Sequence, residues 1–210
     1  MKSEDIINVL DKYYPSARCE LKYTKDYELL IATVLSAQCT DKRVNMVTSI
    51  LFKKYDLKGL KDASEKEIEN IIRPCGSHTK KAKYIKTIAE RLIEDYNGIV
   101  PNNREYLESL PGVGRKTCNV VLSNIYDVPA IAVDTHVARV SKRLGLAKES
   151  DDVSIIEQKL MKKFPKEKWS RLHHQLVLFG RYNCTARNPK CSECLLKEKC
   201  KYYKKLLVNE

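Results

Sequence analysis

Glycine and proline are scarce in this sequence, with seven of each among 210 residues. A protein built of many tight turns needs more of both, so the composition argues against a turn-rich all-β fold. Hydrophobic residues make up 43% of the chain, which is enough for a packed core and excludes wholesale disorder. Long apolar runs are lacking too, since no stretch approaches the roughly 18 residues that a membrane-spanning helix needs.

Acidic residues are outnumbered: 39 Lys and Arg stand against 27 Asp and Glu, which leaves a formal net charge of +12. This balance favours a polyanionic partner such as nucleic acid, although a solubilising surface would give the same charge. The first 15 residues, MKSEDIINVLDKYYP, contain acids and no long apolar run, unlike a secretory signal or transit peptide. We therefore expect a cytoplasmic protein, whose eight Cys are not paired as four disulfides.

Hydrophobic residues recur at helical spacing along most of the chain, and no alternating run predicts a strand. Ser64 and Glu67 form a capping box that opens a helix to about Ile72. We predict about ten helices, among them residues 80–96, 103–109, 115–125, 135–144, 152–164 and 167–182. The last 30 residues, which contain four Cys, have the character of a separate small module.

The segment 110–116, LPGVGRK, joins two of the predicted helices. Gly112 and Gly114 permit backbone angles that are closed to other residues and remove side chains from the turn. The helix that follows presents unpaired N–H groups and the positive end of its dipole, which suit a phosphate oxygen. A tight turn between helices with no ligand is the alternative.

Four Cys near the C-terminus are spaced C-x6-C-x2-C-x5-C: Cys184, Cys191, Cys194 and Cys200. Four thiolates so close in sequence can converge on one metal centre at little cost in loop entropy. Zinc sites normally pair two short Cys knuckles, of which only one is present, and the spacing differs from the ferredoxin type. An iron–sulfur centre, zinc and structural thiols all remain open. We assign no metal to the other four Cys and expect two of them, Cys39 and Cys118, to be buried and inert.

Four motifs in register resemble those of the endonuclease III family of DNA glycosylases. LPGVGRKTCNVVL at 110–122 is similar to the family's helix-hairpin-helix, and AVDTHV at 132–137 to the segment with its catalytic Asp. LSAQCTD at 35–41 resembles the base-gap motif, and the four Cys match the loop that holds a [4Fe–4S] cluster. The matches follow one another from about residue 30 to residue 200.

The resemblance implies an all-α protein of two helical lobes with a DNA-binding cleft between them. Residues 19–128 would form a six-helix barrel domain containing the helix-hairpin-helix. Residues 1–18 together with 129–210 would form the iron–sulfur cluster domain, with the four Cys as ligands of a [4Fe–4S] cluster. We expect a monomer that binds damaged double-stranded DNA and no membrane, and that associates with the nucleoid if the source is prokaryotic.

By the same resemblance, Lys116 and Asp134 are the catalytic residues. Lys116 matches the Lys that attacks C1′ of the damaged nucleotide, expels the base and forms a Schiff base, after which β-elimination cuts the strand. A nucleophile must be a neutral amine, and the positive end of the helix dipole disfavours a charged one. Asp134 would stabilise the oxocarbenium-like sugar and help to activate Lys116, as well as cap a helix. Without the resemblance, Lys116 would be interpreted as a surface lysine and Asp134 as an ordinary helix cap.

Chemistry at C1′ requires the nucleotide to be flipped out of the stack, and something must fill the gap. The resemblance assigns this role to Gln38, which is otherwise a polar residue at a helix end. A second wedge in the family, often Leu, falls near Gly76-Ser77-His78; Ser77 departs from that pattern and leaves open what fills the place. The remaining DNA contacts that we predict are Gly112, Val113, Gly114, His136, Arg187 and Lys190.

The activity implied is that of a bifunctional DNA glycosylase and abasic-site lyase in base-excision repair. It would remove oxidised or ring-saturated pyrimidines through a Schiff base on Lys116. Relatives that remove adenine or mismatched thymine without cutting DNA carry other residues at that position. The alternatives are a related glycosylase for mismatched or oxidised purine bases and a non-catalytic DNA-binding module.

Overall fold

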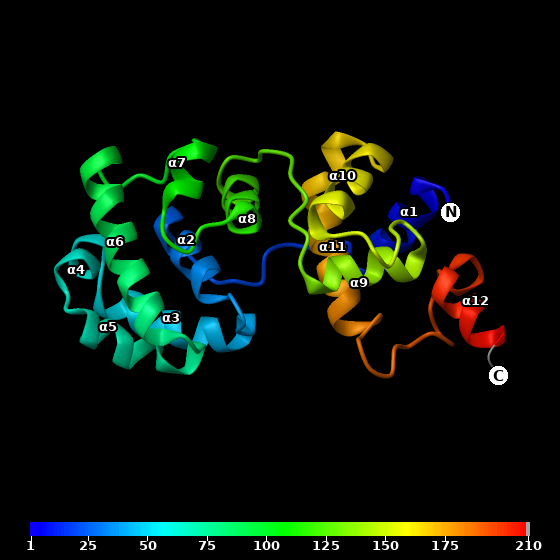
Figure 1. Cartoon of the computed structure of the whole chain (residues 1–210), viewed down its shortest axis with the longest axis horizontal. Helices are drawn as coiled ribbons and strands as arrows, with labels where there is room; N and C mark the ends of the chain where they lie inside the picture. Colours follow the sequence, from blue (N-terminus) through cyan, green and yellow to red (C-terminus); the bar gives the residue numbers. More distant parts are fainter. Residues whose placement is uncertain (209–210) are drawn as a thin grey trace. The chain divides into compact units, whose positions relative to one another are not determined.

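Helices make up all the regular structure in residues 1–208, the part of the chain that this computed structural model describes. The α-helices are α1 (Ser3–Tyr13), α2 (Asp26–Leu35), α3 (Asp41–Lys54), α4 (Leu57–Asp62), α5 (Glu65–Ile72), α6 (His78–Tyr96), α7 (Arg104–Ser109), α8 (Arg115–Ile125), α9 (Thr135–Leu144), α10 (Val153–Lys163), α11 (Trp169–Tyr182) and α12 (Lys201–Val208) (Figure 1). Short 3-10 helices are η1 (Arg73–Cys75), η2 (Lys166–Lys168) and η3 (Lys197–Lys199). The described residues contain no strand, which confirms the all-α prediction. Within residues 1–208, none of these helices is both long and apolar enough to cross a membrane.

The predicted helices agree with α6 to α11 to within two residues at each end. Local caps explain this agreement, because side chains of Asn103, Asp134 and Asp152 each accept a hydrogen bond from the backbone N–H three residues on. The prediction left out α3, which has 14 residues, and the two short helices α4 and α12.

The chain divides into two compact units, Met1–Arg18 with Asp127–Glu210 (unit 1) and Cys19–Tyr126 (unit 2). Unit 2 holds seven α-helices, α2 to α8, where the resemblance implies six; two of the seven, α4 and α7, have only six residues each. The sequence pattern predicted that the last 30 residues form a separate module, and this prediction is wrong. They belong to unit 1, because α12 packs against α9.

Unit 2 is built around α2, which contacts α3, α6 and α8 (Figure 1). Every residue of α2 from Tyr27 to Leu35 is buried. Its sequence, DYELLIATVL, is apolar almost all round, as expected of a helix that neighbours cover on every side. The helix therefore fixes the positions of the hairpin before α8 and of the turn that follows Leu35.

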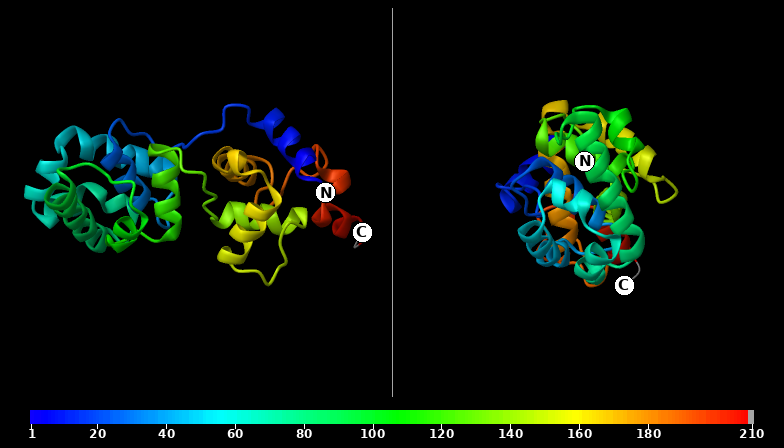
Figure 2. Two further views of the ribbon diagram at one scale, coloured as in Figure 1. Left: turned by 90° about the horizontal axis from the view of Figure 1, so that it is seen from above. Right: turned by 90° about the vertical axis from the view of Figure 1, so that its left-hand side faces the viewer.

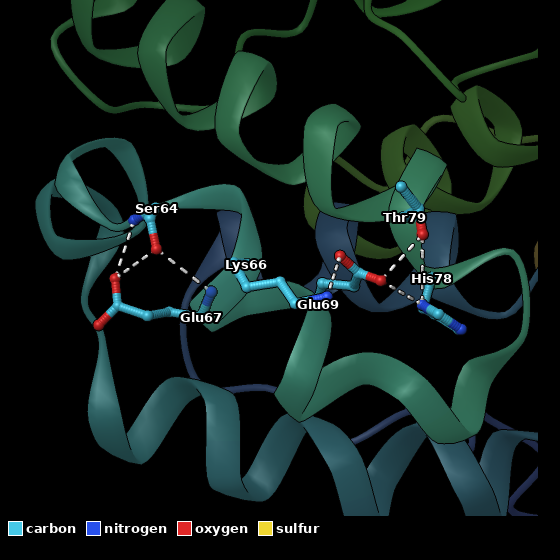
Figure 3. Close-up of polar contacts among 6 residues, drawn as sticks. All are labelled: Ser64, Lys66, Glu67, Glu69, His78 and Thr79. Atoms are coloured by element: carbon cyan, nitrogen blue, oxygen red, sulfur yellow. Dashed lines mark hydrogen bonds and ion pairs between the residues drawn. The ribbon is translucent and has the colours of Figure 1, made fainter.

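Contacts between α5 and the start of α6 fix another edge of unit 2 (Figure 3). The predicted capping box at the start of α5 is present: Glu67 N–H donates to Ser64 Oγ at 3.3 Å, and Ser64 N–H donates to Glu67 Oε2 at 3.0 Å. Further along α5, Glu69 Oε1 accepts from Thr79 Oγ1 at 2.9 Å and lies 3.0 Å from His78 Nδ1. These contacts anchor the segment that leads into α6.

Unit 1 joins the two ends of the chain. Helix α1 packs against α11, and Figure 2 draws this blue N-terminal helix beside the orange C-terminal part. Ile6 and Leu10 are fully buried in the same core as residues of α9, α10 and α11. The N-terminal helix is thus part of the unit that holds the four C-terminal Cys.

Candidate functional site

The hairpin between α7 and α8 turns at Gly112, whose φ is +78°. A Cβ there would lie 2.7 Å from Tyr84 Cδ2 and 3.1 Å from Val34 Cγ1, so both the backbone angle and the packing require glycine. Gly114 differs from the expectation, because its φ of −99° and ψ of −179° are ordinary extended angles. No atom of the described residues lies within 4 Å of a Cβ built on Gly114, so its lack of a side chain leaves that surface open.

Helix α8 begins at this open surface. Gly114 is its N-cap and has no side chain to accept a hydrogen bond from the first turn, which contains no acid. Arg115 and Lys116 are exposed in that turn. Val113 is only 5% exposed and its N–H donates to Leu110 O at 3.1 Å, so its side chain lies in the core and faces no ligand. The exposed backbone and the two cations make this helix start a suitable place for an anion.

Asp134 caps α9, as its position before a helix predicted. Its Oδ1 accepts a hydrogen bond from Val137 N–H at 2.8 Å. The three residues before it, 131–133, are buried and anchor the chain as it enters the helix. Since Asp134 itself is only half-buried, one face of a carboxylate held in fixed orientation remains accessible.

His136 lies in the first turn of α9 and is half-buried. Burial lowers the pKa of His136, Arg139 and Arg181 lower it further, and the Asp134 carboxylate opposes them. Arg139 Nη2 lies 3.2 Å from His136 Nδ1 and donates to Gly180 O at 2.6 Å. The imidazole is therefore held in place by the helix that carries Asp134.

Two arginines that the sequence reasoning missed link α9 to the segment after α11. Arg139 Nε donates to Cys184 O at 3.1 Å. Arg143, one turn later, donates from Nη1 to Thr185 O at 2.6 Å and to Cys184 Sγ at 3.4 Å. The guanidinium of Arg143 also lies 4.3 Å from the ring centroid of Tyr202. Their i, i+4 spacing on one face of α9 was the available signal, but nothing in the sequence indicates what that face contacts.

The four C-terminal Cys line one pocket, part of it open to solvent. Phe179, Leu144 and Tyr202 are among the apolar side chains around it. None of the eight Cys, all of which lie in the described residues, forms a disulfide. Burial raises the pKa of Cys191 and Cys194, and negative charge on the neighbouring thiolates raises both further. Burial thus disfavours the charged form of these side chains, and a cationic centre bound among them would be needed to hold all four as thiolates.

The chemistry of this donor set fits an iron–sulfur cluster. A tetrahedral zinc site with Zn–S bonds of about 2.3 Å needs its sulfur atoms within about 4 Å of one another. Among residues 1–208, no group of three or more His, Cys, Asp or Glu side chains is placed to hold one metal ion. Soft thiolates such as the four that line this cavity are the ligands that an iron–sulfur cluster takes.

Arg187 and Lys190 lie exposed in the loop between the first two of these Cys. Thr185 Oγ1 donates to Arg187 O at 2.8 Å, and Lys190 N–H donates to Asn183 O at 3.0 Å. The loop backbone is therefore held at both ends while the two cationic side chains point to solvent.

Gln38 and Ser77 share an unusual backbone. Five non-glycine residues in the described part of the chain have positive φ, and three of them are Asn or Asp, which tolerate it. The other two are Gln38, with φ of +56°, and Ser77, with φ of +46°. Gln38 is exposed in the turn after α2, and Ser77 is exposed just before α6. Strained backbone of this kind gathers at functional sites, and these are the two places where the resemblance puts gap-filling residues.

Comparison with known proteins covers nearly the whole chain. Residues 31–166 match the HhH-GPD superfamily of base excision DNA repair proteins, and residues 184–200 match the iron–sulfur binding domain of endonuclease III. Endonuclease III of Bacillus subtilis is 48% identical over 201 residues, which are 94% of this chain and 91% of that protein.

Solved structures agree with these matches. A trapped covalent intermediate of an endonuclease III with DNA has a TM-score of 0.92 at 48% identity and covers 99% of both chains. A non-covalent complex of an endonuclease III with DNA has a TM-score of 0.94 at 48% identity, covering 98% of this chain and 96% of that one. The chain therefore belongs to the endonuclease III family: it is a DNA glycosylase and abasic-site lyase of base-excision repair that binds DNA and a [4Fe–4S] cluster.

Proposed function

We propose that the protein removes oxidised or ring-saturated pyrimidines from double-stranded DNA, with Lys116 as nucleophile and Asp134 as its carboxylate partner. The observation that carries the assignment is the start of α8, where Lys116 stands exposed beside a cap that has no side chain. A phosphate bound at that helix start would bring the sugar next to it within reach of Lys116.

The chemistry follows from these two side chains. The Lys116 amine forms a bond to C1′ as the glycosidic bond breaks, and the departing base takes the electron pair and a proton. Asp134, whose orientation its bond to Val137 N–H fixes, stabilises the positive charge that develops on the sugar. Ring opening gives an imine on Lys116, β-elimination breaks the bond to the 3′ oxygen, and hydrolysis of the imine releases the amine.

Opening the duplex falls to other residues of unit 2. Gln38 would enter the gap left by the flipped nucleotide, in line with its exposure and its strained backbone. Ser77 is too small to act as an apolar wedge. His78 follows Ser77 and its ring contacts Glu69, so the His78 imidazole is the larger side chain that could stack on a base there.

The other predicted DNA-binding residues would mainly contact the phosphate backbone of DNA. Gly112 and Gly114 would approach a phosphate with their main chain, and Val113 can do so only with main-chain atoms. Arg187, Lys190 and His136 would contact other phosphates or the lesion. The four Cys would hold the cluster, which when bound supplies metal–thiolate bonds that cross-link the loop carrying Arg187 and Lys190. We further propose that the enzyme is a cytoplasmic monomer.

Borohydride reduction of the imine tests the assignment. We expect covalent trapping on a duplex with thymine glycol, and loss of trapping with retained DNA binding in Lys116→Gln. Lys66→Gln is a matched control, because Lys66 is also an exposed second residue of a helix, α5. Trapping that survives in Lys116→Gln would contradict the role of Lys116. Duplexes with dihydrouracil, 8-oxoguanine or a G·T mismatch identify the lesion, and a preference for the last two would favour the purine or mismatch alternative.

A further inference from the structure

A lysine in the core of unit 2 has no part in the proposed reaction. Lys81 lies in the first turn of α6 and is only 5% exposed. Its Nζ donates to three main-chain carbonyls: Leu35 O at 3.0 Å, Ala37 O at 2.8 Å and Cys75 O at 2.8 Å. An ammonium group has three N–H donors and accepts no hydrogen bond. These contacts therefore use its whole donor capacity and fix the side chain among backbone atoms of the protein.

The carbonyls that Lys81 binds lie at the ends of two helices. Helix α2 ends at Leu35, and the last carbonyls of a helix have no partner within it. The last turn of α2 contains no basic residue, so Lys81 supplies from α6 the cation that favours a helix C-terminus. Cys75 is the last residue of η1, and α6 packs against both η1 and α2. One side chain thus joins two segments that lie far apart in the sequence.

Each of these segments enters a strained turn just after a carbonyl that Lys81 binds. Gln38, with φ of +56°, directly follows Ala37. Ser77, with φ of +46°, follows Cys75 by two positions. Residues with side chains keep a positive φ only where the surrounding structure holds them there. Since Lys81 binds the backbone next to both turns, it is placed to set their conformations together.

A second lysine of α6 makes the same kind of contact without a strained turn. Lys86 Nζ donates to Lys61 O at 2.5 Å and to Ala63 O at 2.8 Å, at the end of α4. None of residues 61–64 has a positive φ. Lys86 therefore shows what a lysine does when it only stabilises a helix end. Lys81 differs from it in the turns that follow the carbonyls.

We propose that Lys81 is a positioning residue for base removal: its bonds to Ala37 O and Cys75 O hold the Gln38 and Ser77 turns in the conformation that fills the gap left by the flipped nucleotide. The role of the two turns rests on the function proposed above, whereas the bonds of Lys81 do not. A turn that is already in place loses little conformational entropy when it enters DNA. Loss of Lys81 should therefore slow the opening of a base pair more than the bond-breaking steps at C1′.

The test measures base removal by the full-length enzyme with its cluster, in single turnover, on two duplexes. One carries thymine glycol opposite adenine, and the other carries it opposite a tetrahydrofuran abasic analogue, so that the lesion is unpaired. Lys81→Met keeps an unbranched side chain and removes all three hydrogen bonds. We expect its rate on the paired lesion to fall by about tenfold or more, and its rate on the unpaired lesion to fall far less. An equal loss on both duplexes, or no loss on either, would overturn the proposal.

Lys86→Met is the matched control, because it removes two bonds of the same kind from the same helix. It should lower the free energy of unfolding, as Lys81→Met does, but leave the ratio of the two rates unchanged. Lys81→Arg keeps a cationic donor and should recover part of the rate on the paired lesion. If Lys81→Met does not fold, Lys81→Gln replaces it, since a shorter amide with two N–H donors cannot make all three bonds.

A second measurement does not depend on the lesion. 2-Aminopurine placed opposite a tetrahydrofuran site reports, through its fluorescence, how a saturating amount of enzyme changes the stacking around the gap. We expect a smaller change with Lys81→Met than with the wild type, and the same change with Lys86→Met. Equal changes in the wild type and Lys81→Met would overturn the role of Lys81. A wild type that removes no thymine glycol contradicts the proposed substrate instead, while the fluorescence still decides the role of Lys81.

Discussion

Helices α5 and α8 both carry an exposed lysine at their second position, yet the two helix starts are built differently. Helix α5 has Ser64 as its N-cap: Ser64 Oγ accepts from Glu67 N–H, the Glu67 carboxylate accepts from Ser64 N–H, and the acids Glu65 and Glu67 balance the helix dipole. Helix α8 begins with Gly114 and has Arg115 and Lys116 in place of acids. One start is capped by a hydroxyl and balanced by acids, whereas the other has a glycine as its N-cap, no acid in its first turn and Lys116 exposed beside it.

The start of α5 shows that this chain caps a helix fully where the helix start has only a structural role. Capping contributes about 1 kcal/mol, so a helix start without a capping side chain forgoes stability. In α8 this loss coincides with a hairpin that only glycine can form at position 112. The same features that weaken the start of α8 make it accessible to a phosphate.

Introducing the capping box of α5 at the start of α8 should have the largest effect of the changes considered, a loss of affinity for DNA. The double variant Gly114→Ser with Thr117→Glu places a capping box there, and the side chain at 114 meets no atom within 4 Å among the described residues. We expect affinity for an abasic duplex to fall by about tenfold or more, or about 1.4 kcal/mol, because the N–H groups are occupied and a negative charge is added. Fluorescence anisotropy measures this affinity.

Two further measurements sharpen that result. The free energy of unfolding in urea should rise by about 1 kcal/mol, since the helix gains a cap. The slope of log affinity against log salt should fall by about 0.9 if one phosphate contact is lost. Gly114→Ser alone adds the hydroxyl without the charge, and unchanged affinity in both variants would remove the helix start from the DNA interface.

Removing the cap of α5 should act on stability alone. Ser64→Ala deletes the hydroxyl that accepts from Glu67 N–H, so we expect the free energy of unfolding to fall by about 1 kcal/mol. Single-turnover cleavage of an abasic duplex by the folded enzyme should not change. Ser49→Ala is the control, because this exposed hydroxyl donates only to Met46 O within α3 and should cost less than about 0.5 kcal/mol. A slower cleavage step in Ser64→Ala would contradict the division between the two helix starts.

The smallest effect expected is one of pH. Hydrogen bonds from the hydroxyl and backbone N–H of Ser64 lower the pKa of Glu67 below its usual 4.5. A carboxyl group with a lowered pKa in the folded state stabilises the protein above its unfolded pKa, and this contribution is lost as pH falls through the folded value. The gap in stability between the wild type and Ser64→Ala should therefore narrow below pH 4.5. Urea titrations at pH 7, 5 and 4 measure it, and a gap that stays constant would show that Glu67 takes no part.

The sequence predicted the elements whose signals are local. The capping box at Ser64, the capping role of Asp134 and the limits of α8 were all predicted correctly, because each depends on residues within one helical turn. The expectation for Gly114 was wrong, since two glycines in one turn do not reveal which of them takes the positive φ. The expectation for Cys39 was wrong too: it follows the apolar helical run that ends at Leu35, but it is half-buried in the turn after that helix and not buried within it.

Residues that act through distant partners were not predictable. In the sequence, Arg139 and Arg143 are only two charged residues on an amphipathic helix. Their hydrogen bonds to Cys184 form because α9 packs beside that residue. Lys81 is one of many lysines in the sequence, and its burial depends on carbonyls of Leu35 and Ala37, which lie on another helix end. Val113 shares the hairpin with two glycines, but only the packing of α8 decides that its side chain is buried.

By itself the sequence determined that this protein is helical, where most of its helices begin, and which residues belong to the hairpin and to the Cys loop. Caps, turns and ligand spacings are short-range, and their energies do not depend on the rest of the fold. The tertiary structure alone decided that Lys81 bonds the carbonyls of Ala37 and Cys75 and that four Cys line one cavity. Those facts depend on how whole helices pack, which is a sum of many weak contacts that no short segment encodes.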